Sequence, residues 1–266
     1  MTEITTLTTF TLAAGETLPP HGPNDYLEPE RWEKVMRPLA KAPGYSGGVL
    51  GPSIEDAKKV MIITAWESSE HLAEFASSAE GQSYQSELAA KSQDQPYAVG
   101  VYFLDTDMRL RQHGMCKATI EVHTIDFPKG CRESIAEKMT VVRGMQYMQY
   151  TQPFGGLANA KPKYHAMSDT IGSPISGWVV QQALGQTNVD QAVWIHFWKS
   201  PEREEHFKRT EVRTMSGVLP GVIRDDDGVA ERVWPIEEFF EEKLRQLGAL
   251  RIVKEHFELK HFPYME

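Results

Sequence analysis

A histidine between two tryptophans is the clearest candidate for chemistry in this sequence. In the segment VWIHFW, residues 193–198, the alternate residues Trp194, His196 and Trp198 share one face if the segment is a strand. Imidazole titrates near neutral pH and can act as a general acid or base. We expect this row to face a cavity; the alternative is that His196 is a hydrogen-bonded histidine of an ordinary core.

A second segment, KATIEVHTIDF at residues 117–127, adds Glu121 and His123 on one face of another strand. If the two strands are neighbours, Glu121, His123 and His196 converge. A carboxylate beside an imidazole fixes its tautomer, so the group suits general acid–base catalysis. The alternative is that Glu121 and His123 face solvent. No ligand spacing supports a metal centre, so we predict no metal and no cofactor.

The histidine row belongs to a segment that occurs twice. VMIITAWESSEHLAEF (residues 60–75) and AVWIHFWKSPEREEHF (192–207) align without a gap, and each reads as an apolar strand, a serine N-cap and a helix. The shared positions are Trp66 and Trp198, Ser68 and Ser200, Glu70 and Glu202, Phe75 and Phe207. In this alignment Thr64 corresponds to His196, so we expect duplication with two unequal half-sites.

The surrounding elements extend the repeat. The expected strands are residues 7–12, 48–50, 60–66, 97–104, 117–127, 175–184, 192–198 and 255–262, and the expected helices are 28–42, 69–90, 132–149, 201–215 and 235–247. Each half has the order β-α-β-β-α-β of a ferredoxin-like unit. The predicted fold class is α+β, with two ferredoxin-like repeats packed sheet to sheet as an intramolecular barrel. The predicted domains are 1–110 and 111–266, the second with insertions at 151–174 and 217–233.

The strand followed by AWESSEHLAEF, and its copy with HFWKSPEREEHF, resemble the antibiotic-biosynthesis-monooxygenase-like branch of the dimeric α+β barrel superfamily. The resemblance covers both halves and implies a fused tandem barrel in which Trp66 and Trp198 face the cavity. Members with a catalytic histidine on the second helix place it near Phe75 and Phe207 of this chain. Both positions are apolar here, so the resemblance does not extend to haem ligation or to catalysis by that histidine.

The expected substrate-binding side chains come from the two copies of the strand and from the segment GMQYMQYTQPFGG at residues 144–156. Tyrosine and methionine in that segment suit an adaptable apolar wall with hydrogen-bond donors, although a helix end packed on the sheet is the alternative. The predicted set is Trp66, Trp194, Trp198, Thr64, Tyr147 and Tyr150.

Composition narrows the function classes. The chain has 266 residues and a formal net charge of −9, which argues against a nucleic-acid surface. Two cysteines fit a reducing compartment, and no run of about 18 apolar residues predicts a membrane span. No secretory signal is recognisable, so we expect a cytoplasmic protein. There is no GxGxxG, Walker or HExxH motif to indicate NAD, ATP or zinc-protease chemistry.

These features predict a cofactor-independent enzyme of small-molecule, secondary-metabolite metabolism. It would act on an apolar, aromatic or polyketide-like substrate by cyclisation, isomerisation or elimination. The alternatives are a cofactor-free monooxygenase of phenolic substrates and a ligand-binding or stress-response barrel without chemistry. Further association into a homodimer is compatible with the sequence.

Overall fold

The computed structural model describes residues 3–18, 32–103, 112, 114–136, 138, 169–171, 174–182, 188–209, 211–214 and 232–261. None of the helices in these ranges has the length and apolar character needed to cross a membrane.

The first half contains four strands and three helices in the predicted order. They are β1 (Ile4–Thr11), α1 (Glu33–Ala40), β2 (Tyr45–Pro52), β3 (Lys59–Trp66), α2 (Ser69–Ser77), α3 (Ala79–Ala90) and β4 (Tyr97–Phe103). The second half contains β5 (Thr119–Pro128), β6 (Ile175–Gln182), β7 (Val189–Trp198), α6 (Pro201–Lys208), β8 (Glu211–Thr214), β9 (Arg232–Pro235), α7 (Ile236–Gln246), β10 (Arg251–Phe257) and β11 (Lys260–His261).

Nine of these strands form one sheet with the order β10-β5-β7-β6-β4-β1-β3-β2-β11. The order β4-β1-β3-β2 of the first half is repeated as β10-β5-β7-β6 in the second. The two halves join through β4 and β6, and β11 pairs with β2 at the other end. Because β10 and β11 follow each other in the chain, the sheet curls round and closes. This confirms the predicted fold class of two ferredoxin-like units in one α+β barrel.

A close backbone approach holds the two edges of the sheet together. Phe257 forms an isolated bridge with Ser53, and the backbone N–H of Glu258 donates to the carbonyl of Pro52 at 3.1 Å. A Cβ atom on Gly51 would lie only 1.7 Å from the carbonyl oxygen of Glu258. Glycine is therefore required where β2 meets the link between β10 and β11.

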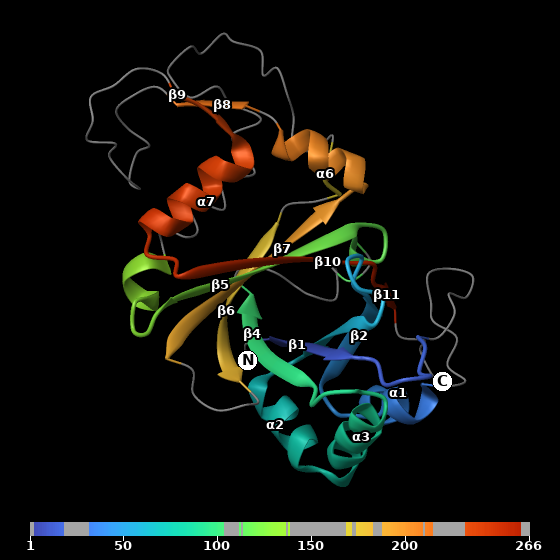
Figure 1. Ribbon diagram of the computed structural model, residues 1–266. Coiled ribbons are helices and arrows are strands. Elements are labelled where there is room, and N and C mark those ends of the chain that lie inside the picture. Colours follow the sequence, from blue (N-terminus) through green and yellow to red (C-terminus); the bar gives the residue numbers. More distant parts are fainter. Residues whose placement is uncertain are drawn as a thin grey trace.

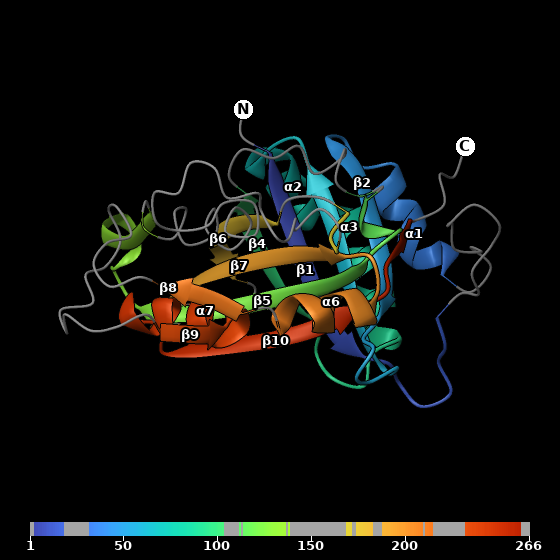
Figure 2. The same ribbon diagram turned by 90° about the horizontal axis from the view of Figure 1, so that it is seen from above.

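The curled sheet has two apolar faces. Its inner face carries side chains from both halves, including Leu7, Ile63, Val122 and Ile195. On the outer face, α1, α2 and α3 cover the strands of the first half, whereas α6 and α7 lie on the opposite side of the molecule (Figure 1). Viewed from above, α6 and α7 run alongside β7, β5 and β10 (Figure 2).

Both strand-to-helix junctions of the sequence repeat have the predicted caps. The hydroxyl of Ser68 accepts a hydrogen bond from the backbone N–H of His71, and the hydroxyl of Ser200 accepts one from Arg203. Each satisfies a helix N–H that has no partner within the helix.

Three expected elements differ from the structure. The helix expected at 69–90 is two helices, because Ser78 is extended and caps α3, and Gly81 allows the chain to approach the carbonyl of Phe75. The helix expected at 201–215 ends at Lys208, since residues 211–214 pair with β9. The last strand begins at residue 251 and changes partner from β5 to β2 after Phe257.

The predicted domain boundary at 110/111 lies outside the described residues, as do most of the predicted insertions at 151–174 and 217–233. The domain limits therefore remain predictions.

Candidate functional site

The tryptophan–histidine row of β7 faces the helices and not the barrel interior. Val193, Ile195 and Phe197 belong to the interior core, so the alternate residues point outward. The ring of Trp198 lies 4.6 Å from that of Phe207 on α6. The expectation that Trp194, His196 and Trp198 face the space shared by the two halves is wrong. Both faces of β7 are apolar and buried, so periodicity could not distinguish them.

The same correction applies to the first half. Trp66 belongs to the core beneath α1, α2 and α3, and its ring lies 5.0 Å from that of Phe75 on α2. Thr64 accepts a hydrogen bond from Nε1 of Trp66 at 2.9 Å. Neither residue lines a cavity shared with the second half.

The predicted convergence of Glu121, His123 and His196 is confirmed, although at the outer face of the sheet. Glu121 on β5 is paired in register with His196 on β7, and the rings of His123 and His196 are 4.7 Å apart. Their exposed fractions are 1%, 6% and 3%, respectively. A buried carboxylate and two imidazoles therefore lie under α6 and α7.

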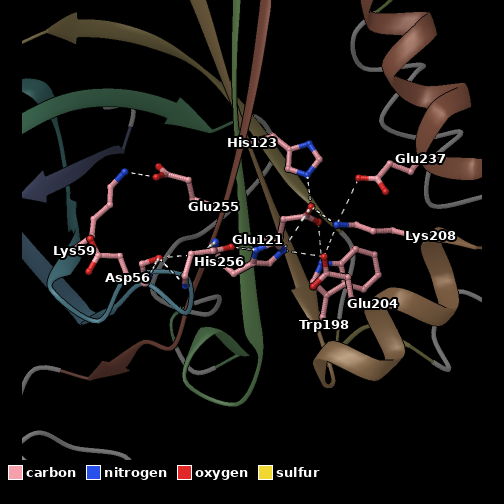
Figure 3. Close-up of polar contacts among 12 residues, drawn as sticks. Asp56, Lys59, Glu121, His123, Trp198, Glu204, Lys208, Glu237, Glu255 and His256 are labelled. Atoms are coloured by element: carbon pink, nitrogen blue, oxygen red, sulfur yellow. Dashed lines mark hydrogen bonds and ion pairs between the residues drawn. The ribbon is translucent and has the colours of Figure 1, made fainter.

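Glu121 is the centre of this group (Figure 3). Its Oε2 accepts a hydrogen bond from Nε1 of Trp198 at 2.9 Å, and its Oε1 lies 3.0 Å from Nε2 of His123. Burial alone would raise the pKa of Glu121, but His123, His196 and Lys208 lower it well below its ordinary value. Glu121 therefore remains a carboxylate and can orient the ring of His123.

Lys208 supplies the positive charge next to Glu121. Its Nζ donates to Oε1 of Glu121 at 2.8 Å, hydrogen bonds to Glu204 and lies 3.6 Å from Glu237 on α7. Burial alone would lower the pKa of Lys208, but Glu121 and Glu204 raise it above its ordinary value. The ammonium is thus charged at every physiological pH.

His196 differs from His123 in its surroundings. Its ring stacks on Trp198 with centroids 5.7 Å apart and planes inclined by 7°, and its Nε2 is buried without a hydrogen-bond partner among the described residues. Burial, and then the charge of His123, lowers the pKa of His196 from 6.5 to about 3. His196 is therefore neutral near pH 7 and a weak base.

His256 on β10 is paired in register with Glu121 on the side opposite His196. Its Nε2 lies 2.8 Å from Oε1 of Glu204, and its Nδ1 contacts Glu55 in the loop after β2. The hydrogen bond with Glu204, together with that to Glu55, raises the pKa of His256 from 6.5 to about 9. The imidazolium therefore connects the loop after β2, where the two edges of the sheet meet, to helix α6.

This geometry predicts a pH-dependent contribution of His256 to stability. Since its pKa is raised on folding, the stabilisation is complete below pH 6.5 and is lost as the pH rises to about 9. The difference in unfolding free energy between the wild type and His256→Gln should shrink over that interval. Urea unfolding from pH 6 to pH 10 measures it, and a difference that does not change with pH would contradict the prediction.

A groove of about 710 Å³ opens between α6 and α7 and is lined by Ile54, Thr119, Pro201, Glu204, Glu205, Lys208, Arg209, Glu237, Glu238 and His256. Its volume suits a small organic ligand. Next to it is an inner pocket of about 20 Å³ that includes Glu121, His123, Trp194 and Trp198 in its wall. Lys208 and Glu237 line both spaces, so the groove and the inner pocket adjoin at these two residues.

Three residues of the site were missed by the sequence analysis: Glu204, Lys208 and His256. Glu204 and Lys208 are one helical turn apart on α6, immediately after the repeated strand, and this spacing could have placed both on the face that covers Glu121. His256 could have been found by pairing the last strand with the strand that carries Glu121. Glu121, Glu204 and His256 offer donor atoms within 4.8 Å of one another, which is the chemistry of a cation site.

Other sequence signals lie outside this site. Tyr147 and Tyr150 are not among the described residues. The run GYSGG at residues 44–48 matches the GxSxG pattern of serine hydrolases, but Ser46 lies within β2 and not at a strand-to-helix turn. A nucleophile elbow is therefore excluded at this position.

No family model matches the chain, and no curated protein sequence matches it. Two solved structures have a similar fold at low identity. An anthrone oxidase-like protein has 10% identity and a TM-score of 0.55, over 100% of this chain and 96% of that one. A proposed monooxygenase from Fusobacterium nucleatum subsp. nucleatum has 6% identity and a TM-score of 0.50, over 98% and 93%.

These similarities extend over nearly the whole length of each chain and agree with the α+β barrel described above. At such identity they establish the fold alone. Membership in the antibiotic-biosynthesis-monooxygenase-like branch remains a prediction.

Proposed function

We propose that the chain is a cofactor-independent enzyme that transfers protons on a small aromatic or polyketide-like molecule. The observation that carries the proposal is the buried pair of Glu121 and His123, 3.0 Å apart, beneath a groove of ligand size. A carboxylate that orients an imidazole is the usual arrangement of a general base. Cyclisation, isomerisation and elimination all begin with such a proton transfer.

The roles differ from those expected from the sequence. His123 is the proposed base, because Oε1 of Glu121 lies 3.0 Å from its Nε2. In the proposed tautomer the proton of the imidazole is on Nε2, beside this carboxylate, and Nδ1 takes up the proton of the substrate. His196 is a neutral neighbour, since burial lowers its pKa to about 3. The ammonium of Lys208, which lines the inner pocket, can stabilise a developing enolate, and such a charge is most effective where water is excluded.

A substrate can reach His123 from the groove only if one side-chain contact opens. The inner pocket is too small for a substrate, whereas the groove is large enough, and the two spaces adjoin at the pair formed by Lys208 and Glu237. A substrate in the groove would separate this pair, place its ring against Trp194 or Trp198 and bring its acidic C–H to His123.

A ligand-binding barrel without chemistry is less well supported. A barrel without chemistry would be expected to have a wholly apolar cavity lining, with His196 hydrogen-bonded to the main chain. The inner pocket instead contains Glu121, His123 and Lys208, and Nε2 of His196 has no hydrogen-bond partner among the described residues.

The test uses anthrone, a tricyclic ketone with an acidic CH₂ group, in deuterated buffer without oxygen. We expect the protein to accelerate hydrogen–deuterium exchange at that CH₂, followed by NMR, because abstraction of the proton is the proposed step. A wild-type protein that binds anthrone without accelerating exchange would refute proton transfer on substrates of this class.

The monooxygenase alternative has the same first step and is distinguished by oxygen. The similar structure described as anthrone oxidase-like is a reason to retain it. In that case the anthrone carbanion reacts with one O₂ to give anthraquinone and hydroxide, which takes up the abstracted proton to form water, so oxygen uptake equals substrate loss. Exchange without oxygen uptake in air supports cyclase, isomerase or lyase chemistry instead.

A further inference from the structure

Three side chains with metal-ligand chemistry meet beside the proposed base. They are Glu121 from β5, Glu204 from α6 and His256 from β10 (Figure 3). Nε2 of His256 lies 2.8 Å from Oε1 of Glu204 and 3.8 Å from Oε1 of Glu121. Ligands of a tetrahedral ion with bonds of about 2.1 Å are about 3.4 Å apart. The spacing is thus close to that of a divalent-metal centre.

The ammonium of Lys208 contacts the same two carboxylate oxygens. Its Nζ is 2.8 Å from Oε1 of Glu121 and hydrogen bonds to Oε1 of Glu204. These carboxylates are buried, with exposed fractions of 1% and 7%. Two buried negative charges require nearby positive charge. Lys208 hydrogen bonds to both carboxylates, and the imidazolium of His256 lies 2.8 Å from Glu204 and 3.8 Å from Glu121.

We infer that Lys208 holds the position of a divalent cation among Glu121, Glu204 and His256, and so acts as the resident cation of a metal-like site. Unlike a metal, the ammonium makes hydrogen bonds and leaves Glu121 free to contact His123 and Trp198. The inference concerns cation chemistry alone and does not depend on the proposed reaction.

Removal of the ammonium should therefore create a metal site. We expect Lys208→Ala to bind one Co²⁺ with a visible absorption band and a raised unfolding temperature. Its dissociation constant for Co²⁺ should be at least about 100-fold lower than that of the wild type, because the ammonium of the wild type occupies the carboxylate oxygens and repels the ion. Isothermal titration and absorption spectroscopy measure both properties.

Two control variants test whether Co²⁺ binds among Glu121, Glu204 and His256. Glu204→Gln added to Lys208→Ala should abolish Co²⁺ binding, because it removes one ligand. Lys254→Ala should not bind Co²⁺, although Lys254 also contacts two carboxylates, Glu237 and Glu241. In the described part of the chain these carboxylates do not belong to a group of three metal-ligand side chains.

Several outcomes decide the inference. Stoichiometric Co²⁺ binding by the wild type that His256→Ala abolishes would overturn it, because the donors would then hold a metal despite Lys208. Failure of Lys208→Ala to bind Co²⁺ would overturn it as well. If this variant folds only when Co²⁺ is added, the inference is supported, and if Co²⁺ does not restore folding, it is overturned.

Discussion

His123→Gln should slow deuterium exchange of anthrone at least about 100-fold, which is the usual scale for a lost general base. Glutamine keeps the approximate size of the imidazole and can place an N–H near the carboxylate of Glu121, but it cannot take up a proton near neutral pH. The loss should therefore appear in the rate of exchange and not in the affinity for anthrone. NMR exchange rates and a ligand titration of the same preparation separate the two.

The first half provides a matched control. Thr8 on β1 follows Thr6 as His123 follows Glu121, and both Thr8 and His123 are 6% exposed. Thr8→Val should leave the exchange rate unchanged. If His196→Gln stops exchange and His123→Gln does not, the assignment of the base is wrong and His196 has the role.

Much of the fold was predictable because the two halves repeat the same local pattern. A tryptophan at the end of an apolar strand, a serine cap and an acidic first turn recur at Trp66 and Trp198, and each junction has the expected cap. Pairing between the strands of His196 and Glu121 followed from the ferredoxin-like order. The convergence of these side chains was therefore available from the sequence.

The face of the sheet on which Trp194, His196 and Trp198 lie could not be predicted from the sequence. Along β7, Ile195 and Phe197 are as apolar as Trp194 and Trp198, and a strand covered on both faces has no polar side to mark the exterior. The aliphatic residues of both halves fill the barrel interior, while the tryptophans fill the space beneath the helices. The contact of Trp198 with Phe207 on α6 agrees with this arrangement.

The charged part of the site was also hidden, because its members come from three distant elements. The spacing of Glu204 and Lys208 is also that of an ordinary ion pair on a helix surface, whereas in the structure they cover Glu121. The last strand was expected at residues 255–262, but it begins at Arg251, and its register places His256 opposite Glu121. Long-range pairing of this kind depends on where a strand begins, and sequence patterns locate strand ends poorly.

The two halves differ most in what lies beneath their helices, and this difference predicts the largest effect on stability. Glu121→Ala should lower the unfolding free energy by at least about 2 kcal/mol, towards the 3–5 kcal/mol found when one partner of a buried pair is removed. The variant would leave Nε1 of Trp198 without its acceptor and Lys208 without one carboxylate. Urea unfolding at pH 7 measures the difference.

Thr6→Ala is the corresponding change in the first half. Thr6 pairs with Thr64 as Glu121 pairs with His196, and the two hydroxyls form a neutral hydrogen bond. Its loss should cost only about 1 kcal/mol. Equal effects of Glu121→Ala and Thr6→Ala would show that the ionic group adds nothing beyond an ordinary buried hydrogen bond.

Measuring the unfolding free energy at different pH values separates the effect of the charge of Glu121 from the effect of its volume. Because its pKa is lower in the folded state than the ordinary value of 4.5, the carboxylate stabilises the fold above pH 4.5, and the stabilisation is lost as the pH falls below that value. The difference between the wild type and Glu121→Gln should be constant from pH 7 to about pH 5 and should narrow on further acidification. A difference that stays constant down to pH 3 would mean that folding leaves the pKa of Glu121 unchanged, so that its carboxylate is not stabilised by His123 or Lys208.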